Sequence, residues 1–570
     1  MCGIFGGTGL SAAELDRALK ALAWRGADDA GSVQLGEMHL ACARLAISGQ
    51  DCPQPIVLGD SGQSLGISFN GNLAGAQALR ERLRFAGEEV ATRNDAELPL
   101  RLWRVEGLAG LQRLEGQFAF ALYDEAQRLL VLGRDAHGEK PLYLKRDEVG
   151  RLRFASSFAA LCSGRRPQLS LAAMESFLLR GWLAPEHVPA EVELLPPGLL
   201  HCEQLSGESS RVPSRPDPVE ASFEDLLLRA VERRLESDRE VALFLSGGLD
   251  SAAIGLALRL LGLRVRCFSA DFVQGREEGE RGARIAHALG FEHERIELGP
   301  ELLDELPRLL AQHGLPFGDA SLLALFGLSR AVREQGVGVA LLGDGGDELF
   351  GGYRRQRAWS WASRYGGWPL RLFANHGHGE LGRLARAAAR RDYAAFWEQA
   401  RPRDVQRLLG RSASVPGPVY VAEEDPRLCD LRHYLPEDLC VKADLATLAA
   451  GVEGRAPLLD ASLIRHAMGG AAPGFDGSSK LPLRRFLARH LPAALREGPK
   501  YGFGLPLQVW LRQSSFLDRC WERLPEHGAI DRGLLQRWTN ELRAGDGRRA
   551  FLLWHAAALA CSGALSSPAS

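Results

Sequence analysis

No charge of one sign dominates the chain, and it has no long apolar run. Its 570 residues include 69 lysines and arginines against 71 aspartates and glutamates, leaving a formal net charge of −2. This balance gives no general attraction to nucleic acid or anionic lipid. No apolar run approaches the roughly 20 residues that span a bilayer, and the first residues lack an export signal pattern. We therefore expect a cytoplasmic protein that acts on small molecules, with no nucleic-acid or membrane partner.

The cysteines lack the spacing of a metal site or of a disulfide framework. Ten cysteines are scattered along the chain without a CxxC pair, as expected for reduced thiols. Nine of them are interpreted as core or surface thiols. The exception is Cys2, in the opening sequence MCGIFGG, because a thiol beside the start of a chain can serve as a nucleophile.

The length predicts two or three domains. Up to about residue 200, short apolar runs such as ACARLAIS, LGISFNG, GQFAFALYD and RLLVLGRD are punctuated by glycine, which indicates a strand-rich domain with a few helices, one near Ala76 to Phe85. The polar segment SGESSRVPSRPDP is typical of a linker. We therefore place one domain at 2–205, a linker at 206–218 and a second domain at 219–570.

After the proposed linker, strand and helix patterns alternate. SFEDLLLRAVERRLE predicts a helix capped by Ser222. VALFL then leads through SGGLDS into AAIGLALRLLG, VRCFSADF precedes a helix near Glu280 to Leu289, and VGVALLG runs into DGGDELFGG. This alternation predicts a parallel sheet with helices on both faces. Beyond about Tyr353 the chain is mostly helical in pattern.

Two acidic glycine turns indicate a site for a nucleotide and a metal ion. SGGLDS, Ser246 to Ser251, stands between a strand and a helix, where backbone N–H groups and the helix dipole can hold an anion. It lacks the lysine of GxxxxGK[ST], and Asp250 offers an oxygen ligand for Mg²⁺. SGG alone would be read as a plain turn. A second turn, GDGGDE at Gly343 to Glu348, also follows a strand, and the carboxyl ends of parallel strands bind ligands in open α/β sheets.

These turns, with GVEGRAPLLD and KYGFGLP further on, resemble in sequence and order the synthetase domain of glutamine-dependent asparagine synthetases, which are pyrophosphatase-loop ATPases. The resemblance implies an adenine nucleotide alpha hydrolase-like α/β domain with a helical C-terminal part. It implies ATP cleavage to AMP and pyrophosphate, with the acceptor carboxylate captured as an acyl-adenylate. The implied ATP-binding residues are Phe244, Ser246, Gly247, Gly248, Leu249, Asp250, Ser251, Ala270, Leu342 and Gly343.

The same resemblance implies further roles in that domain. Asp250 and Asp347 would hold Mg²⁺ on the pyrophosphate, and Lys480 would steady negative charge as the adenylate forms and is attacked. Glu453 matches an acid near the intermediate. Asp344 stands where the family usually has glutamate, which leaves aspartate as the acceptor in question. The alternative for each of these residues is an ordinary surface charge, and for Lys480 taken alone that would be the safer interpretation.

The opening cysteine has a chemical use if the first methionine is removed. A free thiol with a pKa near 8.5 is only a few per cent ionised at neutral pH and needs a base. An α-amino group on Cys2, with a pKa of about 7.7 to 8.0, would supply one. MCGIFGG, followed by RLAIS, FNGN, NDAE and RDAHGEKPLY, resembles class II glutamine amidotransferases. The implied fold is that of N-terminal-nucleophile hydrolases, an αββα sandwich; MCGIFGG alone could be accidental.

The resemblance assigns the donor site. Arg44 would pair with the glutamine carboxylate, and Asp95 with its α-ammonium group. Asn70, through its side-chain amide, and the Gly71 N–H would form the oxyanion hole, and water would free glutamate from the thioester on Cys2. Asn72 replaces a family carboxylate, which predicts weaker glutamine binding or an altered donor site. The implied glutamine-binding residues are Arg44, Leu45, Ala46, Ile47, Ser48, Asn70, Gly71, Asn72 and Asp95.

The leading hypothesis is a glutamine-hydrolysing, ATP-dependent amide synthetase that makes asparagine from aspartate, with ammonia passing internally between Cys2 and Asp344. One alternative keeps the chemistry but amidates another carboxylate, such as a sugar uronic acid in surface-polysaccharide pathways. A second is an ammonia-fed synthetase with a non-catalytic first domain, and a third is an amide hydrolase without nucleotide. A homodimer is implied only by the resemblance.

Overall fold

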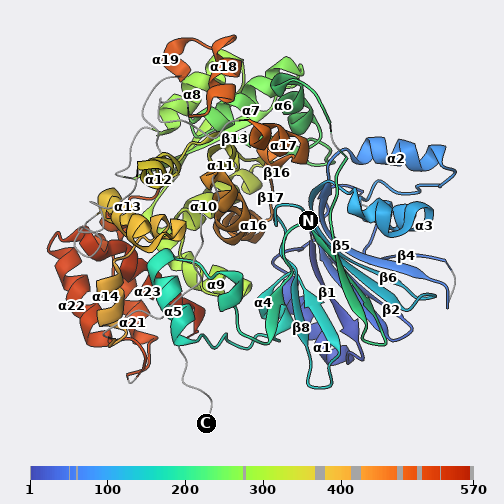
Figure 1. The fold of residues 1–570 in the computed structure, drawn as a ribbon, viewed down its shortest axis with the longest axis horizontal. Helices are drawn as coiled ribbons and strands as arrows, with labels where there is room; N and C mark the ends of the chain where they lie inside the picture. Colours follow the sequence, from blue (N-terminus) through green and yellow to red (C-terminus); the bar gives the residue numbers. More distant parts are fainter. Residues whose placement is uncertain are drawn as a thin grey trace.

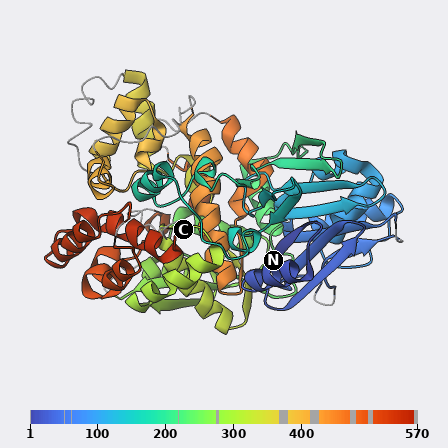
Figure 2. The same ribbon diagram turned by 90° about the horizontal axis from the view of Figure 1, so that it is seen from below.

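The first part of the chain forms two stacked antiparallel sheets (Figures 1 and 2). The computed structural model describes residues 2–49, 52–59, 62–217, 219–273, 278–365, 379–411, 425–470, 479–496, 504–526 and 528–564. One sheet has the order β10-β8-β9-β1-β3-β2 and the other β12-β11-β7-β6-β5-β4. The strands are β1 (Cys2–Thr8), β2 (Asp29–Leu35), β3 (Met38–Arg44), β4 (Ile56–Leu58), β5 (Leu65–Leu73), β6 (Gly116–Asp124), β7 (Leu129–Arg134), β8 (Tyr143–Arg146), β9 (Leu152–Ala155), β10 (Val192–Leu194), β11 (Leu199–Gln204) and β12 (Ser209–Pro213).

Side chains alternate across each sheet, so each sheet buries two faces. Cys2, Ile4 and Cys42 from one sheet meet Ala119 and Leu132 from the other in the inner core. Helices cover the outer faces, and their cores include strand residues from the sheet beneath. These helices are α1 (Ala12–Leu22) and α4 (Phe158–Leu161) on the first sheet, and α2 (Ala76–Phe85) and α3 (Glu97–Gln112) on the second. The predicted αββα sandwich is confirmed.

The segment predicted as a linker is partly a strand. Ser209–Pro213 forms β12, which pairs with β11 at the edge of the second sheet. Four of its five side chains are exposed, so the strand has no buried face and therefore no apolar alternation. The sequence pattern of a polar edge strand is that of a loop, which explains the error.

The second part contains a parallel sheet of order β15-β14-β13-β16-β17. Its strands are β13 (Glu240–Phe244), β14 (Arg266–Phe272), β15 (His293–Leu298), β16 (Val337–Leu341) and β17 (Glu453–Arg455). Leu243 and Leu341 pack with helices on one face, whereas Ala242 and Val337 pack with helices on the other. The covering helices include α6 (Phe223–Glu232), α7 (Leu249–Leu260) and α8 (Glu278–Leu289) on the first of these faces and α10 (Ser321–Glu334) on the second. The prediction of a parallel sheet between helices is confirmed.

The remaining described chain is mostly helical (Figure 1). Its helices are α9 (Leu306–His313), α11 (Gly346–Phe350), α12 (Arg354–Tyr365), α13 (Gly379–Arg390), α14 (Pro402–Leu408), α15 (Pro426–Cys429), a π-helical segment (Asp430–Leu439), α16 (Cys440–Ala449), α17 (Ala461–Gly469), α18 (Leu481–Ala488), α19 (Ala493–Arg496), α20 (Leu507–Gln513), α21 (Phe516–Glu522), α22 (Arg532–Arg543) and α23 (Ala550–Ser562). Short 3₁₀ helices are Pro185–His187, Pro300–Glu305, Tyr393–Phe396, Pro457–Leu459 and Gly547–Arg549. Within the described residues, no helix combines the length and apolar character needed to cross a membrane.

The two parts share an extensive boundary. Helix α5 (Leu171–Arg180), from the range predicted for the first domain, lies among the C-terminal helices (Figure 1). Its Phe177 and Leu178 share a core with Trp554 of α23. Buried ion pairs also cross the boundary, joining Arg25 to Asp444, Lys140 to Asp444, and Glu139 to Arg234. The parts therefore meet through both apolar packing and desolvated charge.

Candidate active sites

The Cys2 thiol lies between the two antiparallel sheets. β1 is flanked by β3 and β9, and the Cys2 side chain is only 4% exposed. The backbone nitrogen of Cys2 donates a hydrogen bond to Asn70 Oδ1 on β5 of the opposite sheet, at 3.0 Å. In a chain that has lost Met1, this nitrogen is an α-amino group. The sandwich thus brings the proposed nucleophile and base beside the asparagine of the proposed oxyanion hole.

The surroundings of the thiol favour its ionised form. A hydrogen bond from the Cys42 thiol, together with the charge of Arg44 and the backbone N–H of Leu45, overcomes burial and lowers the pKa of Cys2 to about 7. The Gln54 side-chain nitrogen also lies 3.7 Å from Cys2 Sγ. Because a thiol with this pKa is about half ionised at neutral pH, Cys2 is suited to act as a nucleophile.

Asn70 and Gly71, which are predicted to form the oxyanion hole, lie next to each other on β5. Since Asn70 Oδ1 accepts from Cys2, its Nδ2 is directed elsewhere, and this buried nitrogen has no partner among the described residues. It is therefore a donor available to a developing oxyanion. Gly71 has φ of 139°, and a Cβ there would lie 2.0 Å from the Gln117 carbonyl oxygen. Only glycine fits between β5 and β6 at this point.

Asp95 is held by its neighbours. Arg80 forms a buried ion pair with Asp95 Oδ1 at 2.9 Å, while the Leu73 N–H and Asn72 Nδ2 donate to Oδ2 at 2.9 and 3.1 Å. Burial raises the pKa of Asp95 although the charge of Arg80 opposes this. Asn72 Oδ1 is buried without a protein partner among the described residues. The Asn72 amide nitrogen therefore holds Asp95, and the Asn72 amide oxygen remains as a neutral acceptor. The carboxylate that the family usually has at this position would be a charged acceptor.

Arg44 and the segment after it lie at the boundary between the two parts. The Arg44 guanidinium donates to the carbonyls of Ser48 and Gly49, at 3.0 and 2.5 Å. The Ala46 carbonyl accepts from Arg239 of the second part at 2.6 Å. One apolar cluster joins this segment to the second part and contains Leu45, Ile47, Val339 and Leu448. Thus, of the residues predicted to bind glutamine, Leu45, Ala46 and Ile47 also contact the synthetase-like part.

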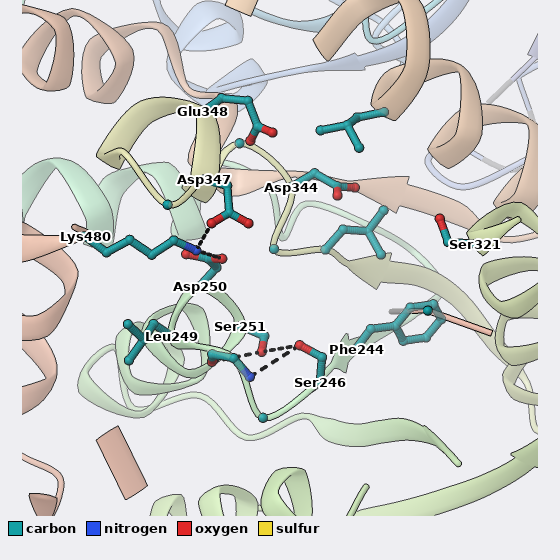
Figure 3. Close-up of a pocket in the computed structure, with 18 of the residues that line it drawn as sticks. Phe244, Ser246, Leu249, Asp250, Ser251, Ser321, Asp344, Asp347, Glu348 and Lys480 are labelled. Carbon is teal, nitrogen blue, oxygen red and sulfur yellow. Dashed lines mark hydrogen bonds and ion pairs between the residues drawn. The ribbon is translucent and has the colours of Figure 1, made fainter. Parts of the chain in front are cut away.

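The two acidic glycine turns meet at the end of the parallel sheet. The order of the strands reverses between β13 and β16, where open α/β sheets bind ligands. A Cβ on Gly346 would lie 2.2 Å from Asp250 Oδ1, so the turns are in contact. They border a cavity of about 660 Å³ (Figure 3), which is in the size range of nucleotide and cofactor sites.

Lys480 joins the two turns (Figure 3). Its Nζ lies 2.5 Å from Asp250 Oδ2 and 2.7 Å from Asp347 Oδ1. Burial would lower the pKa of Lys480, but the two carboxylates raise it, so the lysine is charged. Mg²⁺ is usually held by one or two carboxylates plus substrate phosphates. The converging Asp250 and Asp347 provide such a pair, and the donor set fits the predicted ion.

Most residues predicted for the nucleotide site border this cavity. Ala270 is an exception, because it is buried in the core on β14, whereas Phe268 and Ser269 of the same strand face the cavity. The predicted residues at the cavity are Phe244, Ser246, Gly247, Gly248, Leu249, Asp250, Ser251, Leu342, Gly343, Asp344, Asp347 and Lys480. Of the KYGFGLP motif, residues 500–503 lie outside the described residues.

Asp344 lies beside further ionisable groups. Burial raises its pKa, and the positive charge of Lys442 opposes this rise. Burial and the charge of Asp347 raise the pKa of Glu348 to about 7, while the Tyr353 hydroxyl donates to the Glu348 carboxylate. The cavity therefore contains one carboxyl group, that of Glu348, that can exchange a proton near neutral pH.

Glu453 does not border the nucleotide cavity. It is 1% exposed, and its Oε1 accepts from Arg455 at 2.6 Å and from Gln117 of β6 at 3.4 Å. Burial would raise the pKa of Glu453, but the charge and hydrogen bond of Arg455 lower it to about 2. The side chain therefore lies at the boundary between the two parts, as a permanently charged group.

A small second cavity lies at the boundary between the two parts. Its volume is about 20 Å³, and it is bordered by Lys140 and Glu139 of the first part and by Asp344 of the second. Asp444 also borders it and binds Arg25, whose Nε donates to the Cys2 carbonyl at 3.3 Å. Contacts from Cys2 to Arg25 and from Arg25 to Asp444 thus lead from the first site to a cavity that Asp344 also borders.

Sequence reasoning missed several residues of these sites. Gln117 and Lys140 stand in the quoted motifs GQFAFALYD and RDAHGEKPLY, which therefore carried a usable signal, and Arg25 begins the sequence RGADD. Gln54 stands in an irregular loop without a pattern. Other residues at the nucleotide cavity come from helices and loops outside the two turns: Arg281, Asp319, Ser321, Tyr353, Arg354, Arg357, Tyr434, Lys442 and Arg484.

The geometry defines a class of enzyme with two sites, one built on a buried thiol in an αββα sandwich and one on paired acidic turns at a parallel sheet. Models of two families match the chain. The asparagine synthase model matches residues 222–562, and the glutamine amidotransferase domain model matches residues 1–211. Because the first covers more than half of the chain, the protein belongs to the asparagine synthase family, the ATP-using and glutamine-hydrolysing carbon–nitrogen ligases.

Named relatives agree with this assignment. The chain is 29% identical to a putative asparagine synthetase [glutamine-hydrolyzing] of Mycobacterium tuberculosis, over 94% of this chain and 90% of the relative. It is 25% identical to asparagine synthetase [glutamine-hydrolyzing] 1 of Bacillus subtilis, over 86% and 83%. It is also 27% identical to the amidase chyE of Penicillium rubens, over 70% and 64%.

Proposed function

We propose that this enzyme transfers the amide nitrogen of glutamine to the side-chain carboxylate of aspartate, forming asparagine, glutamate, AMP and pyrophosphate. The observation that supports the proposal is the series of contacts that leads from Cys2 to the cavity beside Asp344. Cys2 contacts Arg25, Arg25 binds Asp444, and Asp444 borders the cavity that Asp344 also borders. We infer that nitrogen released at the first site moves along this boundary to the second, where an activated acid exposed to water would be hydrolysed.

In the first site, Cys2 attacks the glutamine side-chain amide. The nitrogen that binds Asn70 Oδ1, as an α-amino group, takes the thiol proton and returns it to the leaving ammonia. Asn70 Nδ2, buried without a partner among the described residues, and the Gly71 N–H stabilise the tetrahedral oxyanion. Water then hydrolyses the glutamyl thioester. Arg44 and Asp95 orient the carboxylate and ammonium groups of glutamine.

In the second site, the acceptor carboxylate attacks the α-phosphorus of ATP and displaces pyrophosphate. The turns at Ser246–Ser251 and Gly343–Asp347 hold the nucleotide, and Lys480 stabilises charge on the phosphates. Mg²⁺ bound by Asp250 and Asp347 would neutralise charge on the leaving pyrophosphate. Ammonia then attacks the carbonyl of the acyl-adenylate, the bond to AMP breaks, and Asp344, which borders the small boundary cavity, takes up the proton that the nitrogen loses.

The acceptor is tested with glutamine labelled with ¹⁵N in its side-chain amide. Enzyme, ATP, Mg²⁺ and a panel of carboxylic acids are combined, pyrophosphate is measured and products are identified by mass spectrometry. Aspartate should give labelled asparagine and stoichiometric AMP. The panel includes sugar uronic acids, because Asp344 is one methylene shorter than the glutamate usual in the family. Labelled product from a uronic acid with none from aspartate would reject asparagine as the product.

The role of the first domain is tested separately with Cys2→Ala. This variant should lose glutamine-supported synthesis but retain synthesis from ammonium salts, because the nucleotide site is built from other residues. The N-terminal residue of the active enzyme should be Cys2, as determined by mass spectrometry. Full glutamine-supported synthesis by Cys2→Ala would show that the first domain is not the glutaminase.

A further inference from the structure

Gln54 is a buried side chain that no catalytic role yet explains. It is 4% exposed and lies in the loop between β3 and β4. Its Nε2 is 3.7 Å from Cys2 Sγ, and its Oε1 accepts from the Phe69 backbone N–H at 2.9 Å. Cys42 Sγ lies 3.8 Å from the same Oε1. One amide therefore touches the reacting thiol, the neighbouring thiol and the strand that carries Asn70.

The direction of this amide is set by its surroundings. The Phe69 N–H can only donate, so the Gln54 atom that faces it must be oxygen. The amide nitrogen then has to face Cys2, because the two atoms stand on opposite sides of the same planar group. An NH₂ group has hydrogens to donate and no acceptor, so its contact with sulfur favours the thiolate over the thiol.

Other groups also act on the Cys2 sulfur, and their effects have to be distinguished from that of Gln54. The Cys42 thiol donates from β3, the Leu45 N–H donates from the following segment, and the Arg44 charge and the N-terminal charge act over a longer range. Gln54 differs from these because it bridges the two sheets, reaching from the Phe69 backbone of β5 to Cys2 of β1. Its loss should alter both the ionisation and the position of the thiol.

We propose that Gln54 is a positioning residue of the glutaminase site, which holds the Cys2 sulfur in its attacking place by a hydrogen bond from a side-chain amide locked by Phe69. This role rests on the proposed function, in which Cys2 attacks glutamine. It makes Gln54 act through Cys2, without any contact to the substrate. The expected effect is therefore on kcat and its pH dependence, with little change in KM for glutamine.

Gln54→Glu is the sharpest test. The variant keeps an oxygen for the Phe69 N–H but replaces the donor facing Cys2 with a second carboxylate oxygen. The rate of Cys2 alkylation by iodoacetamide, followed by peptide mass spectrometry, should rise with pH around a midpoint at least about one unit higher than in the wild type. Thiolate at pH 7 then falls about fivefold. Glutaminase kcat should fall at least as much, with its pH profile displaced in the same direction.

Two further variants make the test specific. Gln54→Met removes the donor without adding charge and should give a smaller displacement in the same direction. Gln112→Met is a matched control, because Gln112 donates its amide to the Pro213 carbonyl, on an exposed surface, and its alkylation profile should equal that of the wild type. Synthesis from ammonium salts should remain unchanged in all three and so reports correct folding.

The outcomes distinguish this role from the proposed function. An unchanged alkylation midpoint and kcat in Gln54→Glu would overturn the role of Gln54 while leaving the nucleophile in place. A rise in KM with unchanged kcat and unchanged midpoint would assign Gln54 to substrate binding and would equally overturn it. Glutamine-supported synthesis by Cys2→Ala would instead reject the proposed function itself.

Discussion

Arg25 and Asp444 face each other across the boundary between the two parts as a bidentate pair, with Nη1 2.7 Å from Oδ2 and Nη2 3.0 Å from Oδ1. Both side chains are buried, and Lys140 adds a third charge at 3.3 Å from Asp444 Oδ1. Arg25 also binds the carbonyl of Cys2. One carboxylate of the synthetase-like part thus helps position the first strand of the glutaminase part.

This arrangement predicts a graded response to substitution. Asp444→Leu leaves two buried cations without their carboxylate and should destabilise the protein by about 3 to 5 kcal/mol. Arg25→Met should cost less, because Lys140 still compensates Asp444. Urea unfolding of the two variants measures the difference. Equal losses in both would mean that Lys140 contributes nothing to the pair.

Nitrogen transfer gives a second readout of the same pair. If Arg25 holds the route between the sites, Arg25→Met should hydrolyse glutamine yet release more ammonia to solvent per amide formed. The ratio of glutamate to amide product measures this leakage. A ratio equal to that of the wild type would show that the pair supports stability alone.

Lys480→Met should abolish adenylation. The substitution removes the cation that separates Asp250 from Asp347, at 2.5 and 2.7 Å, and leaves two carboxylates that repel each other and the phosphates. We expect ATP-dependent pyrophosphate release to fall at least about 100-fold, because charge stabilisation is commonly worth several kcal/mol in such sites. Glutamine hydrolysis should continue.

Arg489→Met is the matched control for this cation. Arg489 ends the same helix, α18, but forms an exposed ion pair with Glu224, and such pairs contribute little. Its pyrophosphate release should equal that of the wild type. Substantial adenylation by Lys480→Met would remove the lysine from the nucleotide site.

The ionisation of Glu453 should make the free energy of unfolding depend on pH. Its pKa in the folded protein is lowered to about 2 by Arg455, below the value near 4.3 of an unfolded chain. A lowered carboxyl pKa stabilises the fold above the unfolded pKa, and this stabilisation disappears as the pH falls from about 4.3 to about 2. Glu453→Gln should therefore be less stable at pH 7 by about 3 kcal/mol and should lose less stability on acidification.

The measurement compares urea unfolding of wild type and Glu453→Gln from pH 7 down to pH 3. Only the difference between the two matters, because other carboxyl groups titrate in both proteins. A constant difference across this range would show that Glu453 has an ordinary pKa and that Arg455 does not hold its charge.

The motifs carried most of the site, because each is local in sequence. SGGLDS and GDGGDE lie at strand ends, and the parallel sheet brings them together as expected. The helix capped by Ser222 is confirmed by the bond from the Asp225 N–H to Ser222 Oγ. Local patterns fix such elements because the cap and the periodic apolar residues lie within a few residues of each other.

What could not be predicted depends on contacts between distant segments. Glu453 follows a family motif, yet its side chain is directed to Gln117 and Arg455 because β17 lies against the first part of the chain. Gln54 contacts both Cys2 and Phe69 only after the two sheets have stacked, and no periodicity marks it. Neither face of the strand β12 is buried, so its sequence has no alternation of apolar and polar residues. Each of these positions is set by tertiary packing and has no local signature.

Gly71→Ala should inactivate the glutaminase site through the backbone. Gly71 has φ of 139°, which side chains rarely adopt, and a new Cβ would lie 2.0 Å from the carbonyl oxygen of Gln117 on β6. The strands would have to separate beside Asn70, which would displace the oxyanion-hole donors. We expect glutamine hydrolysis to fall at least about 100-fold, as when such a donor is removed, with synthesis from ammonium salts retained.

Gly66→Ala on the same strand is its control. A Cβ there would first meet Leu35 Cδ1, at 2.5 Å, which is the end of a flexible side chain, whereas at Gly71 it meets a backbone oxygen that is fixed in the β5–β6 pairing. Rotation of Leu35 relieves the first clash at the cost of some core packing, and glutamine hydrolysis should be largely kept. If both variants lost activity equally, the defect would lie in the strand as a whole and the oxyanion hole would not depend on the conformation of Gly71.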